Sequence, residues 1–164
     1  MSNRKVYLAL YKGKKEGRGL KVRWARFRDW LVRTVTRSPY SHCEIAVTVH
    51  PKTLYTCYSA SARDGGVRCK VMALPAEKWD LIPLPESCIQ SAVGLYTRTQ
   101  GARYDWSGAI GTVLKTPPSK GRWFCSEWCA YVIGYTNPCR YSPQTLYAAV
   151  STKDRPSEKM GETK

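Results

Sequence analysis

The chain is poor in acidic residues and in histidine, and it lacks any long apolar run. It has 164 residues, with 12 Asp or Glu against 27 Lys or Arg, and only two histidines. No stretch approaches the ~20 consecutive apolar residues that a membrane-spanning helix needs. The first five residues lead into a strand pattern rather than a signal peptide. We therefore expect a protein without a transmembrane segment, made and used in a cytoplasm.

The cysteines also lack the spacing of a disulfide framework or a zinc site. There are seven, an odd number, which argues against a secreted disulfide scaffold and favours free thiols. Cys43, Cys57 and Cys69 lie near His42 and His50 in sequence, but no Cys-x-x-Cys or His-x-x-x-His pair is present. We predict no structural metal and no cofactor.

The length favours one domain with a core of its own. We expect residues 1–153 to form a single α+β domain. The polar segment 154–164 lacks the apolar residues needed for a core, so we expect a disordered tail.

Positive charge is concentrated at the N-terminus. Residues 1–37 carry twelve Lys or Arg against two acids, which is +10 of the net charge of +15. The apolar residues of 20–35 recur at helical spacing and leave an opposite, basic side. Such a side attracts polyanions such as nucleic acid or an acidic surface, although a merely solvated face is the alternative. The candidate anion-binding residues are Arg23, Arg26, Arg33 and Arg37.

The remaining pattern alternates first like strands and then like helices. Segments rich in β-formers, joined by turns such as 63–66, predict an antiparallel meander. Apolar residues at helical spacing follow, with Ile89, Val93 and Tyr96 on one predicted face. The fold class is therefore α+β, an antiparallel sheet of about five strands packed against the helix that bears Cys125. The expected strands are 5–11, 42–50, 53–61, 67–72 and 79–84, and the expected helices are 85–99, 104–114, 125–133 and 143–150.

Cys125 stands where a loop enters an apolar helix. Free backbone N–H groups at a helix start favour a thiolate, so this cysteine is a candidate nucleophile. A free cysteine is more often a small buried hydrophobe, and that role fits Cys129 one turn later. Cys125 instead precedes the apolar run, and its own backbone N–H is a candidate donor to an oxyanion.

A thiol nucleophile needs a base, and His42 is the histidine that opens a strand pattern after a turn. Strand alternation places His42 and Glu44 on one face with Ala46 and Thr48, and it places the apolar residues Cys43, Ile45, Val47 and Val49 on the other. A third polar group should orient the imidazole. Glu44 is one candidate for this role, and Ser59 on the neighbouring predicted strand is the other.

Together these motifs resemble the circularly permuted branch of the NlpC-type papain-fold superfamily, which includes small tailed-phage proteins. The resemblance covers roughly residues 5–150 and rests on four short segments: 41–45, 58–61, 63–68 and 125–127. It implies a papain-like cysteine peptidase, amidase or acyltransferase, with Cys125 as nucleophile and His42 as base. Many permuted relatives carry a polar or acidic group on the strand after the histidine, where this chain has Ser59. Tyr40 could supply an oxyanion donor, close the groove or simply pack.

Two functional hypotheses follow. In the first, Cys125 attacks the carbonyl carbon of a peptide, amide or ester, with His42 as the acid and base. In the second, a basic phage protein with a papain-like fold binds nucleic acid or another polyanion and has no catalysis. A phage origin implies the host cytoplasm, and association with the virion stays open, as does the oligomeric state.

Overall fold

A five-stranded antiparallel sheet forms the centre of the protein, in the order β4-β3-β2-β1-β5. The computed structural model describes residues 4–13, 38–49, 53–109 and 119–152. Each predicted strand is confirmed, and no end differs from its predicted position by more than two residues. The strands are β1 (Val6–Tyr11), β2 (His42–Thr48), β3 (Leu54–Ser61), β4 (Gly66–Ala73) and β5 (Trp79–Leu84).

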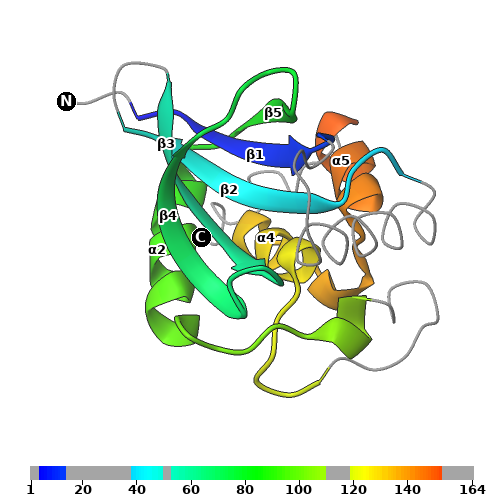
Figure 1. Cartoon of the computed structure of the whole chain (residues 1–164). Helices are drawn as coiled ribbons and strands as arrows, with labels where there is room; N and C mark the ends of the chain where they lie inside the picture. Colours follow the sequence, from blue (N-terminus) through cyan, green and yellow to red (C-terminus); the bar gives the residue numbers. More distant parts are fainter. Residues whose placement is uncertain (1–3, 14–37, 50–52, 110–118, 153–164) are drawn as a thin grey trace, which may run out of the picture.

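Helices pack against one face of this sheet, so the predicted α+β class is confirmed. Figure 1 shows α4 against β2, with α2 near β4 and α5 near the other end of the sheet. A further helical turn at 106–109 begins the predicted helix 104–114, whose remainder lies outside the described residues. The helices with printed bounds are α2 (Ser87–Thr99), α4 (Cys125–Ile133), the 3-10 helix η1 (Pro138–Arg140) and α5 (Pro143–Ser151).

Strand alternation divides β2 between two apolar clusters, as the pattern predicts. Cys43 and Ile45 are fully buried in the main core, which they share with Trp128 of α4. Ala46 belongs to a smaller cluster on the opposite face, together with Tyr11 of β1. His42 and Glu44 have the parity of Ala46, so they stand on this second face of the sheet.

The predicted apolar face of α2 is wrong at Val93 alone, because Ile89 and Tyr96 are partly buried against the core. Cys88, Ala92 and Leu95 are its buried residues, whereas Val93 is 45 % exposed. One residue turns a helix by about 100°, because there are 3.6 residues in each turn. Small side chains at 88 and 92 let the helix approach the core closely, and the larger residue at 93 faces outward.

Several expectations fall outside the described residues. These include the basic helix with Arg23, Arg26, Arg33 and Arg37, and the tail 154–164. Within the described ranges, each helix falls short of the length and apolarity that crossing a bilayer requires.

Candidate active site

Cys125 is the first residue of α4. Phe124 precedes it in an extended conformation, with φ −111° and ψ 163°, so the chain turns into the helix at the cysteine itself. The Glu127 carboxylate accepts the backbone N–H of Phe124 at 3.4 Å and satisfies a donor of the first turn. One turn further, Cys129 is fully buried, as its predicted core role requires.

The Cys125 thiol meets the imidazole of His42 and the thiol of Cys43. The pKa of Cys125 lies well below its usual value, because Cys43 and His42 hydrogen-bond to its sulfur and outweigh the effect of burial. Burial lowers the pKa of His42, but hydrogen bonds with Cys125 and Glu44 outweigh it and raise this pKa to about 10. The favoured state at neutral pH is therefore a thiolate beside an imidazolium. Burial keeps Cys43 a neutral thiol, which can donate to the Cys125 sulfur.

Glu44 holds the other side of the His42 ring. His42 Nε2 lies 3.0 Å from Glu44 Oε1, which leaves Nδ1 as the ring nitrogen available to Cys125. Glu44 is 1 % exposed, and burial alone would raise its pKa. Hydrogen bonds from His42 and Arg68 outweigh burial and lower the pKa of Glu44 to about 2. The carboxylate is thus ionised and accepts an N–H from the imidazole.

Arg68 of β4 completes this array, and no role was predicted for it from the sequence. Its Nη2 and Nη1 donate to Glu44 Oε1 and Oε2 at 2.6 Å and 2.8 Å. Its Nε donates to Asp64 Oδ2 at 3.0 Å, and Lys70 donates to the second oxygen of Asp64. A continuous chain of ion pairs therefore links Lys70 to His42. It runs through Asp64, Arg68 and Glu44.

Ser59 lies between Glu44 and Arg68 in the sheet. It is the register partner of Arg68, and the pairing of Ile45 with Tyr58 places Ser59 beside Glu44. Its hydroxyl donates to the Cys43 carbonyl at 2.8 Å. Because Ser59 is small, the Arg68 side chain can reach across β3 to Glu44.

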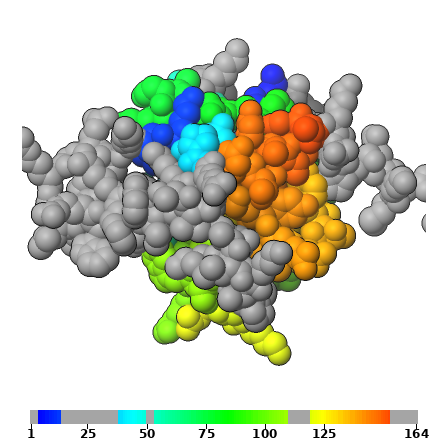
Figure 2. Space-filling view, turned by 90° about the vertical axis from the view of Figure 1, so that its right-hand side faces the viewer, coloured from blue at the N-terminus to red at the C-terminus, as the bar shows by residue number. Residues whose placement is uncertain are grey.

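Tyr40 fixes the segment that enters β2. Its hydroxyl donates to Asp80 Oδ2 at 2.8 Å, and its ring lies 5.3 Å from that of Tyr147 in α5. Burial, followed by the hydrogen bond to Asp80, raises the pKa of Tyr40. Figure 2 shows the cyan segment at the start of β2 beside α5, in orange. These contacts tie Tyr40 to β5 and α5.

Tyr104 lies beside Cys125, and no role was predicted for it from the sequence. Its hydroxyl hydrogen-bonds to the Cys125 thiol and accepts the Cys125 backbone N–H. Burial, with the neighbouring thiol, raises the pKa of Tyr104 well above its usual value, so the hydroxyl stays a donor. Backbone bridges hold the residue: Tyr104 pairs with Trp123, and its N–H donates to the Gly65 carbonyl at 2.9 Å. No local motif signals these long-range bridges.

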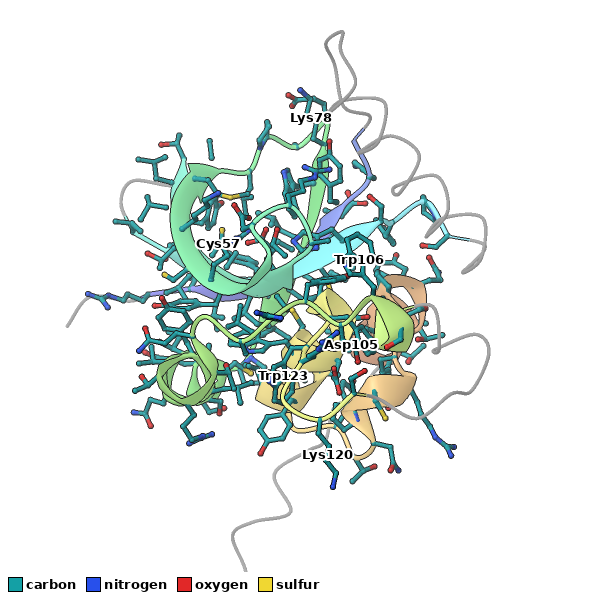
Figure 3. All side chains as sticks on the ribbon, turned by 60° about the horizontal axis from the view of Figure 1, so that its bottom comes forward. Cys57, Lys78, Asp105, Trp106, Lys120 and Trp123 are labelled. Carbon is teal, nitrogen blue, oxygen red and sulfur yellow. The ribbon has the colours of Figure 1, made fainter. Side chains whose placement is uncertain are left out.

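A pocket of about 230 Å³ opens beside the imidazole. Strands β3 and β4 curl around this side of the sheet, with Cys57 inside the bend and Trp106 toward the helices (Figure 3). Trp106 is 42 % exposed, and its ring lies 4.9 Å from that of Tyr104. The pocket is lined by Tyr11, Ser41, His42, Glu44, Ser61, Ala62, Arg63, Asp64, Arg68, Lys70, Met72, Trp79, Tyr104 and Trp106.

The seven cysteines are free thiols, and in the described part of the chain no three His, Cys, Asp or Glu side chains are grouped to hold a metal ion. Comparison of the chain with family models, with curated proteins and with solved structures finds no match.

Proposed function

We propose that the protein is a thiol hydrolase or acyl-transfer enzyme of the permuted NlpC-type papain fold, acting on an amide or ester. One observation carries the proposal: the His42 imidazole contacts the Cys125 thiol on one side and the Glu44 carboxylate on the other. A nucleophile, a base and a group that orients the base are the three parts that thiol catalysis needs.

In the proposed mechanism, Cys125 Sγ attacks the carbonyl carbon, and the carbonyl π electrons move to oxygen. The backbone N–H of Cys125 and the Tyr104 hydroxyl, which hydrogen-bond to each other without substrate, both donate to this oxyanion. As the tetrahedral species collapses, the carbon–leaving-group bond breaks and His42 donates its proton to the leaving group. His42 then removes a proton from water or from another acyl acceptor. The deprotonated water or acceptor attacks the thioester carbonyl and releases Cys125. Glu44 holds the imidazole in place during both steps.

The test is turnover of an unbiased panel of amides, peptides and esters by Cys125→Ala and His42→Ala variants. We expect each change to lower kcat/KM by more than ~10³-fold, since members of such an array act as a unit. Cys139→Ala is the matched control, because Cys139 is a partly exposed free thiol outside the site. Turnover that survives in both Cys125→Ala and His42→Ala would remove the proposal.

The N-terminal charge supports binding of a polyanion as a second candidate function. The observation is the excess of +10 within residues 1–37. In a tailed-phage protein of the host cytoplasm or virion, this segment could bring the domain to nucleic acid. Binding of a single-stranded oligonucleotide should weaken steeply with salt and with replacement of Arg23, Arg26, Arg33 and Arg37 by Gln. Cys125→Ala should leave that binding unchanged.

A further inference from the structure

We infer that Asp105 is a positioning residue, which holds Tyr104 against Cys125. The inference rests on the proposed function, because it concerns the geometry of the same site. Asp105 follows Tyr104 directly in the chain. Its side chain is fully buried and does not line the pocket beside His42, so it acts through its neighbour rather than on a substrate.

Two backbone hydrogen bonds fix Tyr104 to the segment that enters α4. The Asp105 N–H donates to the Trp123 carbonyl at 2.9 Å, and the Trp123 N–H donates to the Arg103 carbonyl at 3.1 Å. Tyr104 stands between these two bonds, and Trp123 is two residues before Cys125. Figure 3 shows Asp105 and Trp123 beside α4. The position of Tyr104 relative to Cys125 therefore depends on where Asp105 is held.

The carboxylate of Asp105 accepts four hydrogen bonds from two segments of the chain. Ser107 Oγ and the Gly108 N–H donate to Oδ1 at 2.7 Å and 2.9 Å. The Ser119 hydroxyl also donates to Oδ1, at 3.1 Å, and the Ser119 backbone N–H donates to Oδ2 at 2.9 Å. One buried side chain thus joins the turn that follows it to the segment that leads into α4.

Asp105 carries a buried charge that N–H and O–H groups balance. Burial would raise its pKa, but the backbone N–H groups of Gly108 and Ser119, followed by the hydroxyls of Ser107 and Ser119, outweigh burial and lower this pKa. The carboxylate is therefore ionised, although none of the ion pairs among the described residues includes it. A buried ion is costly without its hydrogen bonds. The same cost opposes displacement of the carboxylate from these donors, so the charge makes the anchor rigid.

The space around the carboxylate is closely filled. A Cβ at Gly108 would stand 2.5 Å from Asp105 Oδ2 and 3.0 Å from Phe124 Cδ1. Phe124 directly precedes Cys125 and is 1 % exposed. The helical turn at 106–109 therefore packs on both Asp105 and Phe124, and a displaced carboxylate would disturb the start of α4.

Two reactions of Cys125 separate positioning from the reactivity of the thiol. With 4-nitrophenyl acetate, the thiolate attacks the carbonyl carbon and the carbonyl π electrons move to oxygen. The carbonyl then re-forms, the carbon–oxygen bond to the leaving group breaks, and 4-nitrophenolate leaves. With iodoacetamide, the thiolate attacks the methylene carbon and iodide leaves, so no oxyanion forms. The measurement is the ratio of the acylation rate to the alkylation rate at Cys125, followed by mass spectrometry.

We expect Asp105→Asn to lower this ratio about tenfold or more, because displacement of a catalytic group by about 1 Å is costly. Gly108→Ala keeps the charge but displaces the carboxylate, so it should also lower the ratio. In Asp105→Asn/Tyr104→Phe the ratio should be no lower than in Tyr104→Phe alone, because Asp105 acts through this hydroxyl. Val150→Ala is the control, since Val150 is 2 % exposed in α5 and its truncation should reduce stability without changing the ratio.

An unchanged ratio in Asp105→Asn, or in Gly108→Ala if the first variant does not fold, would overturn the inference while the proposed nucleophile stands. An effect of Asp105→Asn that persists in full without the Tyr104 hydroxyl would also overturn it. Failure of both reagents to react at Cys125 in the unmodified protein would instead contradict the proposed function and the inference together.

Discussion

Arg68 donates two hydrogen bonds to the carboxylate of Glu44, at 2.6 Å and 2.8 Å, although β3 lies between their strands. The Arg68 side chain is 15 % exposed and that of Glu44 is 1 % exposed, so the pair is largely removed from water. A buried carboxylate without such a partner would tend to take up a proton. Arg68 therefore keeps Glu44 ionised beside His42.

Replacement of Arg68 by Met should destabilise the fold by about 3–5 kcal/mol, because it leaves a buried carboxylate without its main partner. The measurement is urea unfolding at pH 7. The double variant Arg68→Met/Glu44→Gln should be less destabilised than the sum of the single changes, since the buried charge is also removed. Arg122→Met, at an exposed arginine, is the control. Strict additivity of the two changes would show that the pair contributes no coupling energy.

Glu127 should make the protein less stable as the pH rises. Burial, reinforced by the charge of Asp105 and partly offset by the Phe124 N–H, raises the pKa of Glu127 from 4.5 to about 7. The folded state then binds more protons than the unfolded state between these values, so stability from this group falls from pH 4.5 to 7. Glu127→Gln should increase the free energy of unfolding at pH 8 by about 1–3 kcal/mol and have little effect at pH 4. A loss of stability at pH 8 would contradict this sign.

Tyr104 should contribute to turnover rather than to the reactivity of the thiol. Tyr104→Phe removes the hydroxyl and keeps the ring, so we expect kcat to fall by about 10²-fold, as for the loss of one oxyanion donor. The rate of Cys125 alkylation should change far less. Tyr131→Phe provides the control, because Tyr131 lies on α4 and is 49 % exposed. Equal kcat in the two variants would assign Tyr104 a packing role only.

Gly66 allows the β4 hairpin to approach the segment that carries Tyr104. A Cβ at Gly66 would stand 1.9 Å from the Ala102 carbonyl oxygen, and the backbone would have to move. We expect Gly66→Ala to destabilise the protein by about 1–3 kcal/mol and to slow turnover. Gly94→Ala in α2 should instead stabilise by about 0.5–1 kcal/mol, because its nearest contact would be Arg98 at 3.9 Å. Thermal unfolding of both variants measures the difference. An unchanged stability in Gly66→Ala would contradict the close approach of Gly66 to the Ala102 carbonyl.

Much of the fold could be predicted from local patterns. Alternating apolar residues locate the strands and assign Cys43 and Ile45 to the core, which places His42 and Glu44 together on the other face. The loop before the apolar run locates Cys125 at the helix start. These predictions succeed because a strand has a period of two and a helix a period of 3.6. For α2, helical spacing chose Ile89 and Tyr96, which pack against the core, but it also chose Val93, whereas Ala92 is the buried residue there.

The partners of the candidate site depend on sheet order and on distant bridges. Arg68 reaches Glu44 because β3 pairs with both β2 and β4 and has the small Ser59 at the crossing point. Tyr104 reaches Cys125 through a bridge to Trp123. Neither the strand order nor these bridges can be predicted from a single sequence. The contacts of Arg68 and Tyr104 with the candidate site therefore become visible only in the folded structure.

The most direct test of the account is the rate of Cys125 alkylation by iodoacetamide as a function of pH, in the unmodified protein and in His42→Ala. We predict that Cys125 reacts already at pH 6 and is much faster there than Cys139, because its thiolate is paired with the His42 imidazolium. In His42→Ala the hydrogen bond from Cys43 remains but the imidazolium is lost, so the rate at pH 6 should fall and the pH profile should shift upward. An ordinary profile for Cys125 in the unmodified protein, or the same profile in both proteins, would contradict the thiolate–imidazolium pair.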